Sequence, residues 1–592
     1  MRLPLERGAA LLVLPTAFAL DQPANFGRRE EQRVLSAGNG VSGGGKGRNY
    51  PLGDKFKEFA EASLERWRVP GVAVGVVDGV DIWTEGYGIG TFPSKPVTPS
   101  TLFYTGSTTK AFTAATVSLL IASGNFTPEG SPLSWQTPIS HLIRDDFVLP
   151  PGNEWAQTHL TLEDALSHRT GFPRHDKALG QYYGPDHHRG TVRDVVRSFR
   201  YLPPVTEPRT RWRYCNLMYM VVSHVVQTLT GQWLGDTMRE RIWEPLGMVG
   251  TYFSVEEALD NGEDVAAGYY WDYSNFENGS VEGKGKGFVE VPKESLYLAS
   301  GAGGIVSNVQ DYTRWIQCLI RGDRTSRNES VENGCEVLPK EAHLELKLPR
   351  IVMAHENQLM YDSSLAYALG WEVGTYKGHR IFTHSGGMEA YGAEVYFLPD
   401  LEYGVVTLGN TAQTSNFVGW DISWKLIDNK LDIPEEERFE YTEQVNEILK
   451  SQLKLPETAV DDLYPDRADP PLPRALPLED YVGVYYHPAY QNVTLELIGK
   501  DEVSGSWPRI GGKKSELKAI RDNMEWQMTF EFGHVSGEYW VVIVDSLYVA
   551  NGLARQLARA EFEVGAKGKV EKLKMEFFEN GSEGAIVFDK IA

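Results

Sequence analysis

Two groups of strand-like segments, far apart in the chain, flank a long stretch in which apolar residues recur at helical spacing. The groups comprise residues 72–77 and 80–86 in the first, and 378–382, 390–397 and 402–408 in the second. Asp78-Gly79, between the first two runs, is a strong signal for a β-hairpin. From 103 to 229 the pattern is mainly helical, and a helix over 416–426 follows the last strand. This order predicts an α+β fold, in which strands from both ends complete an antiparallel sheet flanked by a helical cluster.

The chain changes in character after residue 430. Residues 431–477 are acidic and Pro-rich, with one amphipathic helix predicted near 441–453, and we interpret them as a linker. Short strand-like runs follow: 481–486, 493–497, 528–532, 539–544 and 573–578. This spacing is typical of a small all-β barrel or sandwich. We therefore predict an α+β domain over 55–430 and a small barrel-like domain over 478–592.

The N-terminal residues are similar to a secretory signal. Two arginines precede a short apolar stretch, and Ala17-Phe18-Ala19 has the small-x-small form of a signal-peptidase site. Residues 1–19 are therefore a candidate signal peptide, and the Gly-rich residues 20–54 a flexible leader. Five N-x-Ser/Thr sequons fit the same route: Asn125, Asn278, Asn328, Asn492 and Asn580. We expect a secreted glycoprotein, with a cytoplasmic protein as the alternative.

Composition excludes several classes of protein. The chain has 58 basic and 80 acidic side chains, a net charge of −22, which argues against a nucleic-acid partner. No run of about 18 apolar residues is present, so no integral membrane segment is expected. Three cysteines are too few for a disulfide framework or a Cys-rich zinc module. Cys318 and Cys335 are close enough in sequence to pair if the chain is secreted, but sequence proximity does not fix their separation in space.

The candidate catalytic residues are found first through a Ser-x-x-Lys pattern. On a helix, serine and lysine at this spacing lie one turn apart, so the amine can act as the base that activates the hydroxyl. The pattern occurs three times, at Ser107/Lys110, Ser451/Lys454 and Ser515/Lys518. Only the first is preceded by a glycine and followed by a long apolar run, whereas we expect the other two to be solvated. Ser107 is therefore the predicted nucleophile, and an N-cap serine of a core helix is the alternative.

A Tyr-x-Asn pattern also occurs three times, at Tyr214-Cys215-Asn216, Tyr273-Ser274-Asn275 and Tyr490-Gln491-Asn492. A tyrosine beside a lysine can shuttle a proton, and the asparagine can orient the lysine or a substrate amide. Only Tyr214 precedes a long apolar helix in the way that Ser107 does. We select Tyr214 on that ground; a core tyrosine is the alternative.

A third element, His384-Ser385-Gly386-Gly387, lies in a Gly-rich turn predicted between two strands. Glycines at a strand edge let a substrate backbone lie alongside. A free N–H there can complete an oxyanion hole with the N–H of Ser107.

In this order, Ser107-Thr108-Thr109-Lys110, Tyr214-Cys215-Asn216 and His384-Ser385-Gly386 resemble the active-site elements of the serine β-lactamase and penicillin-binding superfamily. The similarity is to its class C-like branch, with D-aminopeptidases, esterases and acyltransferases. Further similar stretches are 166–171, 244–248 and 301–305, and the tail from 478 resembles a lipocalin-like domain.

The resemblance implies a role for each matching residue. Ser107 would be acylated, while Lys110 and Tyr214 would share acid/base work. The remaining implied site residues are Asn216, His384, Ser385 and Gly386 for substrate, with the N–H groups of Ser107 and Gly387 as the oxyanion hole. The β-lactamases carry lysine at the place of His384, and a neutral imidazole would attract a substrate carboxylate less. This departure puts β-lactam hydrolysis in doubt, and the sequence leaves that activity open.

These observations predict a serine hydrolase that forms an acyl-enzyme with an ester or amide in a small-molecule or peptide substrate. The alternatives are an acyltransferase with the same nucleophile and a catalytically inactive ligand-binding relative. No cofactor is expected. The loop residues His168, His175, His187, His188, Asp176 and Asp186 lack the spacing of a metal-binding motif, so no metal is expected either.

Overall fold

The computed structural model describes residues 50–183, 188–273, 287–293, 295–326, 335–353, 360–499, 509–549, 551–579 and 581–592. The candidate signal peptide, residues 1–19, and the leader up to residue 49 lie outside the described residues. So do three of the five sequon asparagines, at 278, 328 and 580, and the loop residues 186 and 187.

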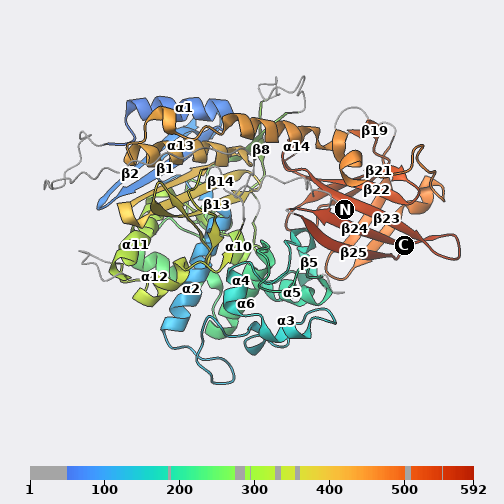
Figure 1. Cartoon of the computed structure of the whole chain (residues 1–592), viewed down its shortest axis with the longest axis horizontal. Helices are drawn as coiled ribbons and strands as arrows, with labels where there is room; N and C mark the ends of the chain where they lie inside the picture. Colours follow the sequence, from blue (N-terminus) through green and yellow to red (C-terminus); the bar gives the residue numbers. More distant parts are fainter. Residues whose placement is uncertain are drawn as a thin grey trace.

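A nine-stranded antiparallel sheet forms the centre of the first domain (Figure 1). In sheet order the strands are β10 (Ile351–Val352), β11 (Ala366–Tyr367), β12 (Glu372–Tyr376), β13 (His379–Met388), β14 (Tyr391–Leu398), β15 (Tyr403–Gly409), β1 (Gly71–Asp78), β2 (Asp81–Thr91) and β3 (Lys95–Pro96). β1 pairs with β2 and β15, with Val74 opposite both Glu85 and Thr407. The predicted closure of the sheet by strands from both ends of the domain is therefore confirmed.

Helices cover both faces of this sheet, which explains why β1 is a continuous apolar run. Val72, Val74 and Val76 pack with residues of α1 (Asp54–Trp67) and α13 (Thr414–Lys430) on one face. Ala73 and Val77 belong to the core on the other face, which α11 (Val309–Ser326) covers. Figure 1 shows α1 and α13 above the strands and α11 below them.

The helical cluster lies on the α11 side of the sheet (Figure 1). Its helices are α2 (Thr109–Ala122), α3 (Glu154–His159), α4 (Leu162–Leu166), α5 (Val192–Ser198), α6 (Asn216–Thr230), α7 (Leu234–Met238), α8 (Glu244–Leu246), α9 (Val255–Asp260), α10 (Ser300–Gly303) and α12 (Lys340–Lys347). α2 is buried on almost all sides, as its apolar sequence predicts. The remaining short strands form three separate antiparallel pairs: β4 (Phe103–Tyr104) with β9 (Val306–Ser307), β7 (Gly268–Trp271) with β8 (Phe288–Val291), and β5 (Tyr182–Tyr183) with β6 (His188–Arg189).

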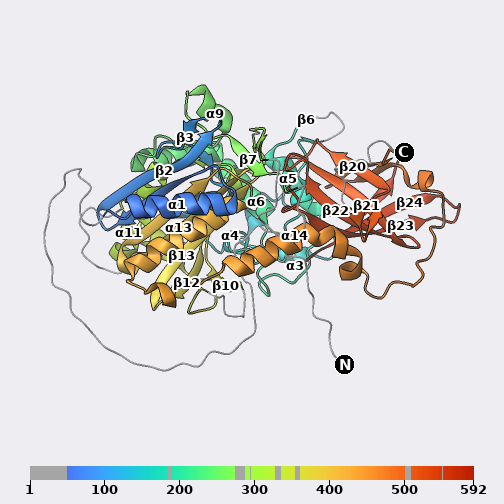
Figure 2. The same ribbon diagram turned by 90° about the horizontal axis from the view of Figure 1, so that it is seen from above.

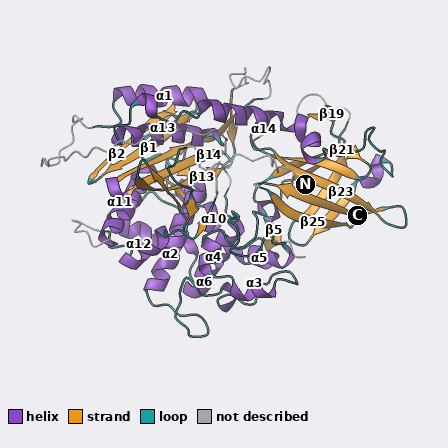
Figure 3. Ribbon diagram, viewed as in Figure 1, coloured by secondary structure: helices purple, strands orange, loops and turns teal. Residues whose placement is uncertain are grey.

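The C-terminal region is a closed antiparallel barrel, shown as the cluster of arrows in Figure 3. Its strands are β16 (Gly483–His487), β17 (Gln491–Leu497), β20 (Leu517–Arg521), β21 (Met528–Ser536), β22 (Tyr539–Ser546), β23 (Gln556–Val564), β24 (Val570–Phe578) and β25 (Ser582–Lys590), with β18 (Arg509–Ile510) and β19 (Lys513–Lys514) as a separate pair. Aromatic residues such as Tyr485, Phe530, Trp540, Phe562 and Phe577 are fully or almost fully buried in it. The barrel therefore has a packed aromatic core.

One long helix, α14 (Thr442–Leu463), joins the two parts (Figure 2). Val445 and Leu449, in its first half, belong to the apolar cluster that α1 and α13 form with one face of the sheet. Leu455 and Ala459, in its second half, belong to a cluster with barrel residues. The helix continues to Leu463, past the predicted end, with Pro456 inside it.

Direct contacts also join the barrel to the segment that follows α4. The hydroxyl of Tyr490 and Nδ1 of His175 are 2.8 Å apart, and Gln491 donates to the carbonyl of Tyr182 at 2.8 Å. The guanidinium of Arg521 donates to the carbonyl of Lys177 at 3.0 Å. The barrel is thus seated on the segment around 174–183, which borders the candidate site described below.

Two further features concern the chain as a whole. A disulfide links Cys318 to Cys335, which tethers α11 to the segment before α12, and Cys215 is free and buried. Among the described residues, the helices are all too short or too polar to cross a lipid bilayer.

Candidate active site

Ser107 lies in a single 3₁₀ turn, η1 (Gly106–Thr108), that runs directly into α2. Gly106 has φ +53°, and a Cβ there would lie 2.7 Å from the backbone nitrogen of Gly387. Glycine is therefore required at this position, both for its conformation and for the close approach to β13. This approach sets Ser107 against the end of β13.

Lys110 is fully buried in the first turn of α2. Its Nζ is 3.0 Å from Ser107 Oγ, 2.8 Å from Asn216 Oδ1 and 2.7 Å from the carbonyl oxygen of Ala302. Burial lowers the pKa of Lys110 well below its ordinary value, and the nearby charge of Arg174 lowers it further. The amine is therefore poised to be neutral at a pH where a solvated lysine is charged.

Tyr214 completes the group, from the loop that precedes α6. Its hydroxyl donates a hydrogen bond of 2.7 Å to Ser107 Oγ, and Lys110 Nζ lies 4.8 Å from the centre of its ring. Burial raises the pKa of Tyr214, while Arg174 and the bond to Ser107 oppose the rise. The structure thus brings Ser107, Lys110, Tyr214 and Asn216 together, as the sequence patterns predict.

His168, which sequence reasoning assigned to an ordinary loop, packs on this group. Its ring centre is 4.2 Å from that of Tyr214, and its Nδ1 accepts a hydrogen bond of 3.1 Å from the backbone nitrogen of Cys215. Burial lowers the pKa of His168 well below its usual range, and Lys110 contributes to the fall. The neutral imidazole therefore fixes the position of the segment that carries Tyr214. His168 lies in the 166–171 stretch, whose similarity to the superfamily was the sequence signal that could have identified it.

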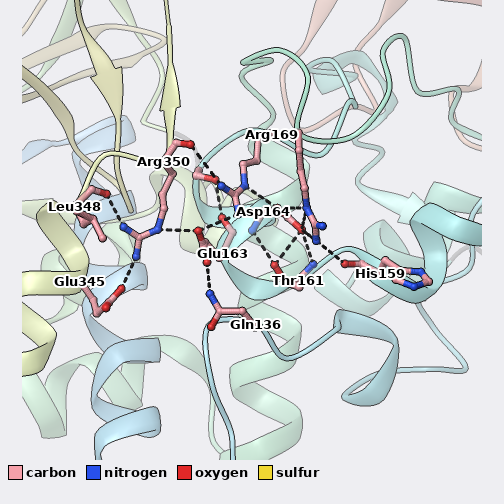
Figure 4. A network of polar contacts seen from close by, with 11 residues as sticks. Gln136, His159, Thr161, Glu163, Asp164, Arg169, Glu345, Leu348 and Arg350 are labelled. Atoms are coloured by element: carbon pink, nitrogen blue, oxygen red, sulfur yellow. Dashed lines mark hydrogen bonds and ion pairs between the residues drawn. The ribbon is translucent and has the colours of Figure 1, made fainter.

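An ionic network is centred on the buried carboxylate of Asp164 (Figure 4). Asp164 accepts hydrogen bonds from Arg169 Nε at 2.6 Å and from Arg209 Nη2 at 2.7 Å. Arg209 also donates its backbone N–H to the carbonyl of Arg169 at 2.7 Å. Because Arg209 belongs to the loop that leads to Tyr214, the network ties that loop to the end of α4.

The sequence analysis predicted a turn at His384-Ser385-Gly386-Gly387. The structure instead places these four residues in β13, which continues to Met388. The pairing of β12 with β13 ends at Thr383, so β13 pairs only with β14 beyond that point. The glycine-rich segment therefore has an edge turned toward η1. Gly386 fits there because a Cβ would lie 2.0 Å from the carbonyl oxygen of Thr105. The expectation of glycines at a strand edge holds, although the strand is longer than predicted.

His384 and Ser385 are buried, 1% and 3% exposed. His384 Nε2 is 2.8 Å from the hydroxyl of Tyr367, and its Nδ1 is 2.7 Å from the carbonyl of Ser385. Burial, with a contribution from Lys110, lowers the pKa of His384 to about 3. The ring is therefore neutral at ordinary pH and held by protein partners on both nitrogens. Neither residue lines the cleft in front of Ser107, whereas Asn216 and Gly387 do.

A cavity of about 210 Å³ opens in front of Ser107. One side consists of Ser107, Asn216, Ala302, Gly303 and Gly387, from the α+β domain. The other side comes from the barrel and its loops: Trp526, Gln527, Met528, Val544, Asp545, Ser546, Val549, Ala554, Gln556 and Glu579. Sequence analysis did not predict that the barrel borders the site, because its residues lie more than three hundred positions from Ser107.

Charged residues of the cleft pair across the two domains. Arg174 lies 2.9 Å from Asp176 and 3.0 Å from Glu579, and Lys177 lies 3.2 Å from Glu579 and 3.1 Å from Glu583. The buried charges therefore compensate one another. None of these roles was predicted, since each sequence position alone is an ordinary charged residue.

The other matches to the Ser-x-x-Lys and Tyr-x-Asn patterns lie outside the group around Ser107. Ser451 and Lys454 are exposed on α14, as expected, but Ser515 and Lys518 are buried in the barrel region, 8% exposed each, which corrects the expectation that they are solvated. Tyr490 is buried in the barrel interface. Of the loop histidines, His175 is fully buried and His188 is paired with Asp194. Among the described residues, the one cluster with metal-ligand geometry is Cys318, Cys335 and His343, and it contains the disulfide.

Comparisons with known proteins identify the family. Residues 56–426 match the protein family described as Beta-lactamase, and residues 467–589 match a domain of unknown function, DUF3471. The chain is 40% identical over 518 residues to "Unguisins hydrolase ungD'" of Aspergillus campestris, which covers 88% of each chain. It is 37% identical to "Unguisins hydrolase ungD" of Aspergillus violaceofuscus, over 83% of each chain.

Among solved structures, the octameric penicillin-binding protein homologue from Pyrococcus abyssi superposes with a TM-score of 0.51 at 18% identity. It covers 90% of this chain and 99% of that chain. The likeness extends the shared fold beyond the sheet and helices to most of the chain. The protein therefore belongs to the beta-lactamase family, as a hydrolase-type member whose sheet domain is followed by a lipocalin-like closed barrel.

Proposed function

We propose that the protein is a serine hydrolase that cleaves an amide bond through an acyl-enzyme on Ser107. The observation that carries the proposal is the position of Ser107 Oγ. It lies 3.0 Å from the amine of Lys110 and 2.7 Å from the hydroxyl of Tyr214, at the wall of the cleft. A hydroxyl within hydrogen-bond distance of a general base is the arrangement that activates a serine nucleophile.

The bonding of Lys110 supports its role as the base. A neutral amine has two N–H groups and one lone pair. Oxygen acceptors at Asn216 and Ala302 lie 2.8 and 2.7 Å away and take the two N–H groups. The lone pair is then directed at the hydroxyl of Ser107, whose proton it accepts as Oγ attacks the carbonyl carbon.

The developing oxyanion needs hydrogen-bond donors that are already in place. The backbone N–H of Ser107, at the start of α2, and that of Gly387, on the open edge of β13, are the donors that we assign. The contact between Gly106 and Gly387 keeps the two segments together. The positive end of the α2 dipole favours the same charge.

The second half of the acylation expels an amine, which is a poor leaving group unless it is protonated. Tyr214 keeps its proton because burial raises its pKa, and it can pass that proton to the leaving nitrogen. Lys110 returns its proton to Tyr214. Water then adds to the acyl carbonyl, loses a proton to the same pair and releases the acid and free Ser107.

The charge of the cleft indicates the substrate class. Both cations that line the described cleft, Arg174 and Lys177, are paired with carboxylates. His384 is neutral and buried. A substrate carboxylate would therefore meet no free counter-charge, which favours an uncharged peptide-like amide. Two relatives are named unguisins hydrolases, so unguisins are the first candidate substrates.

The proposal is tested by incubating the purified protein with an unguisin, with uncharged peptide amides and with the same amides carrying a free carboxylate. Mass spectrometry should detect products that have gained one water from the uncharged amides, and Ser107→Ala should form none. Turnover that is equal in Ser107→Ala would exclude the proposed nucleophile. Products in which an added amine replaces water would favour the acyltransferase alternative.

A further inference from the structure

A chain of paired polar groups runs from the barrel to the proposed base. Glu579, directly after β24, lies with its Oε1 3.0 Å from Nε of Arg174, and its side chain is 4% exposed. Nη1 of Arg174 lies 2.9 Å from Oδ2 of Asp176. The same oxygen accepts from Nδ2 of Asn216 at 2.9 Å, and Oδ1 of Asn216 accepts from Lys110 at 2.8 Å. The contact of Glu579 with Arg174 is an ion pair, and the remaining steps of the chain are hydrogen bonds.

Arg174 is the centre of this chain. Its side chain is 7% exposed, and its guanidinium lies 4.7 Å from the centre of the Tyr214 ring. A buried cation needs compensating charge. One of its carboxylates, Asp176, is two residues away in sequence, whereas the other, Glu579, is supplied by the barrel.

Glu579 is itself held from two sides. Its second oxygen lies 3.2 Å from Nζ of Lys177, and Lys177 is paired with Glu583 at 3.1 Å. The side chains of all three residues are at most 4% exposed. Glu579 is therefore fixed in one orientation, with one oxygen on Arg174 and the other on Lys177.

We propose that Glu579 is a positioning residue for the serine chemistry, acting through Arg174 to hold Lys110 and Tyr214 at the oxygen of Ser107. The inference rests on the proposed function and adds the barrel to the machinery of the site. Glu579 lines the cleft but acts through another residue, so the effect is on the geometry and charge around the base. The barrel is then part of the active enzyme.

The charge balance around Lys110 gives this role a measurable consequence. Burial is the main cause of its lowered pKa, and Arg174 lowers it further. Glu579 offsets part of the positive charge of Arg174, so a neutral residue in its place would lower the pKa of Lys110 still more. The other titratable or aromatic groups that face Lys110 are Asp176, Cys215, His168, His384, Tyr214 and Tyr219.

The test compares Glu579→Gln with the full-length wild-type protein, with hydrolysis of p-nitrophenyl acetate followed from pH 5 to 10. The variant keeps the size of the side chain and removes its charge. We expect kcat to fall by about tenfold, because the base and phenol are less well held. We also expect the acid limb of kcat/KM to move by roughly half a pH unit to lower pH.

Two further variants separate positioning from general stability. Glu576→Gln is the matched control on β24, three residues before Glu579. Its carboxylate pairs with Arg559 at 3.7 Å, and the substitution should leave the pH profile unchanged. Glu579→Asp retains the charge and should keep the limb at its wild-type position. A Glu579→Gln protein with a lower Tm but an unmoved limb would overturn the proposal.

If Glu579→Gln does not fold, Arg174→Gln gives an independent result of the opposite sign. It removes the positive charge that lowers the pKa of Lys110, so the acid limb should move to higher pH. An unmoved limb would contradict the proposed role of Glu579 and Arg174. Labelling of Ser107 by a fluorophosphonate separates the two proposals. Labelled wild type with an unmoved limb in the variants contradicts only the role of Glu579, whereas activity that survives in Ser107→Ala contradicts the proposed function.

Discussion

The hydroxyl of Tyr214 lies 2.7 Å from Ser107 Oγ and donates a hydrogen bond to it. The two residues are 107 positions apart and come from different elements, the loop before α6 and the turn before α2. Each comes directly before a buried helix, and the close packing of those helices brings the two groups together. This contact leads to the first prediction.

Tyr214→Phe should lower kcat by about 10²–10⁴-fold, because it removes the proton donor for the leaving group and keeps the ring. The packing of that ring on His168 should preserve the fold. Steady-state kinetics and thermal unfolding of the variant measure both effects. Tyr252→Phe, which loses a hydroxyl bonded to Glu263, is the control and should retain activity.

The activity should depend on pH through Lys110. The base must be neutral, and the pKa of Lys110 is lowered well below that of free lysine. Activity should therefore fall as acid protonates the amine and should reach its plateau well below pH 10. A pH–kcat/KM profile measures this, and Lys110→Met should lose both the activity and the acid limb. A rate that rises only near pH 10.5 would show an unperturbed lysine.

Stability in acid should depend on Asp146. Burial alone would raise its pKa, but hydrogen bonds from His224, Arg197 and Arg193 lower it to about 2. Since the folded pKa lies below the unfolded value of about 3.9, Asp146 stabilises the fold above that pH and loses its effect as pH falls toward 2.

Asp146→Asn should therefore reduce the free energy of unfolding by about 2 kcal/mol at pH 7 and by much less at pH 2.5. Urea titrations of both proteins at the two pH values measure the difference. An equal difference at both would show that the carboxylate charge is not the cause.

The Cys318–Cys335 disulfide, which spans 17 residues, should contribute about 3 kcal/mol to stability by restricting the unfolded chain. The Cys318→Ser/Cys335→Ser double variant should unfold at lower denaturant than the oxidised wild type. Wild type treated with a reducing agent should behave like the variant. Identical unfolding of oxidised and reduced wild type would contradict the prediction.

The sheet and the barrel were predictable to different degrees. The β1 run is visible because both of its faces are buried, so nearly every residue is apolar. The sequence pattern did not predict β20 or β23. Their buried positions include the alanines Ala519, Ala558 and Ala560, which weaken the alternation of apolar and polar residues. The two-residue strands β10 and β11 are too short to have a pattern.

The candidate site was also only partly predictable from the sequence. Ser107, Lys110 and Tyr214 could be selected because each lies in a local pattern next to an apolar helix. Arg174 and Glu579 could not, because their relation exists only after the barrel is seated on the α+β domain. Sequence spacing carries information along one element, but ion pairs between domains depend on tertiary packing.

The most direct test of the account is the identification of the acylated residue. The folded protein is treated with a fluorophosphonate, digested and analysed by tandem mass spectrometry, with Lys110→Met treated in parallel. The account predicts one adduct, on the peptide that contains Ser107, and much slower labelling in the variant. An active protein whose adduct lies on another residue, or that forms no adduct, would contradict it.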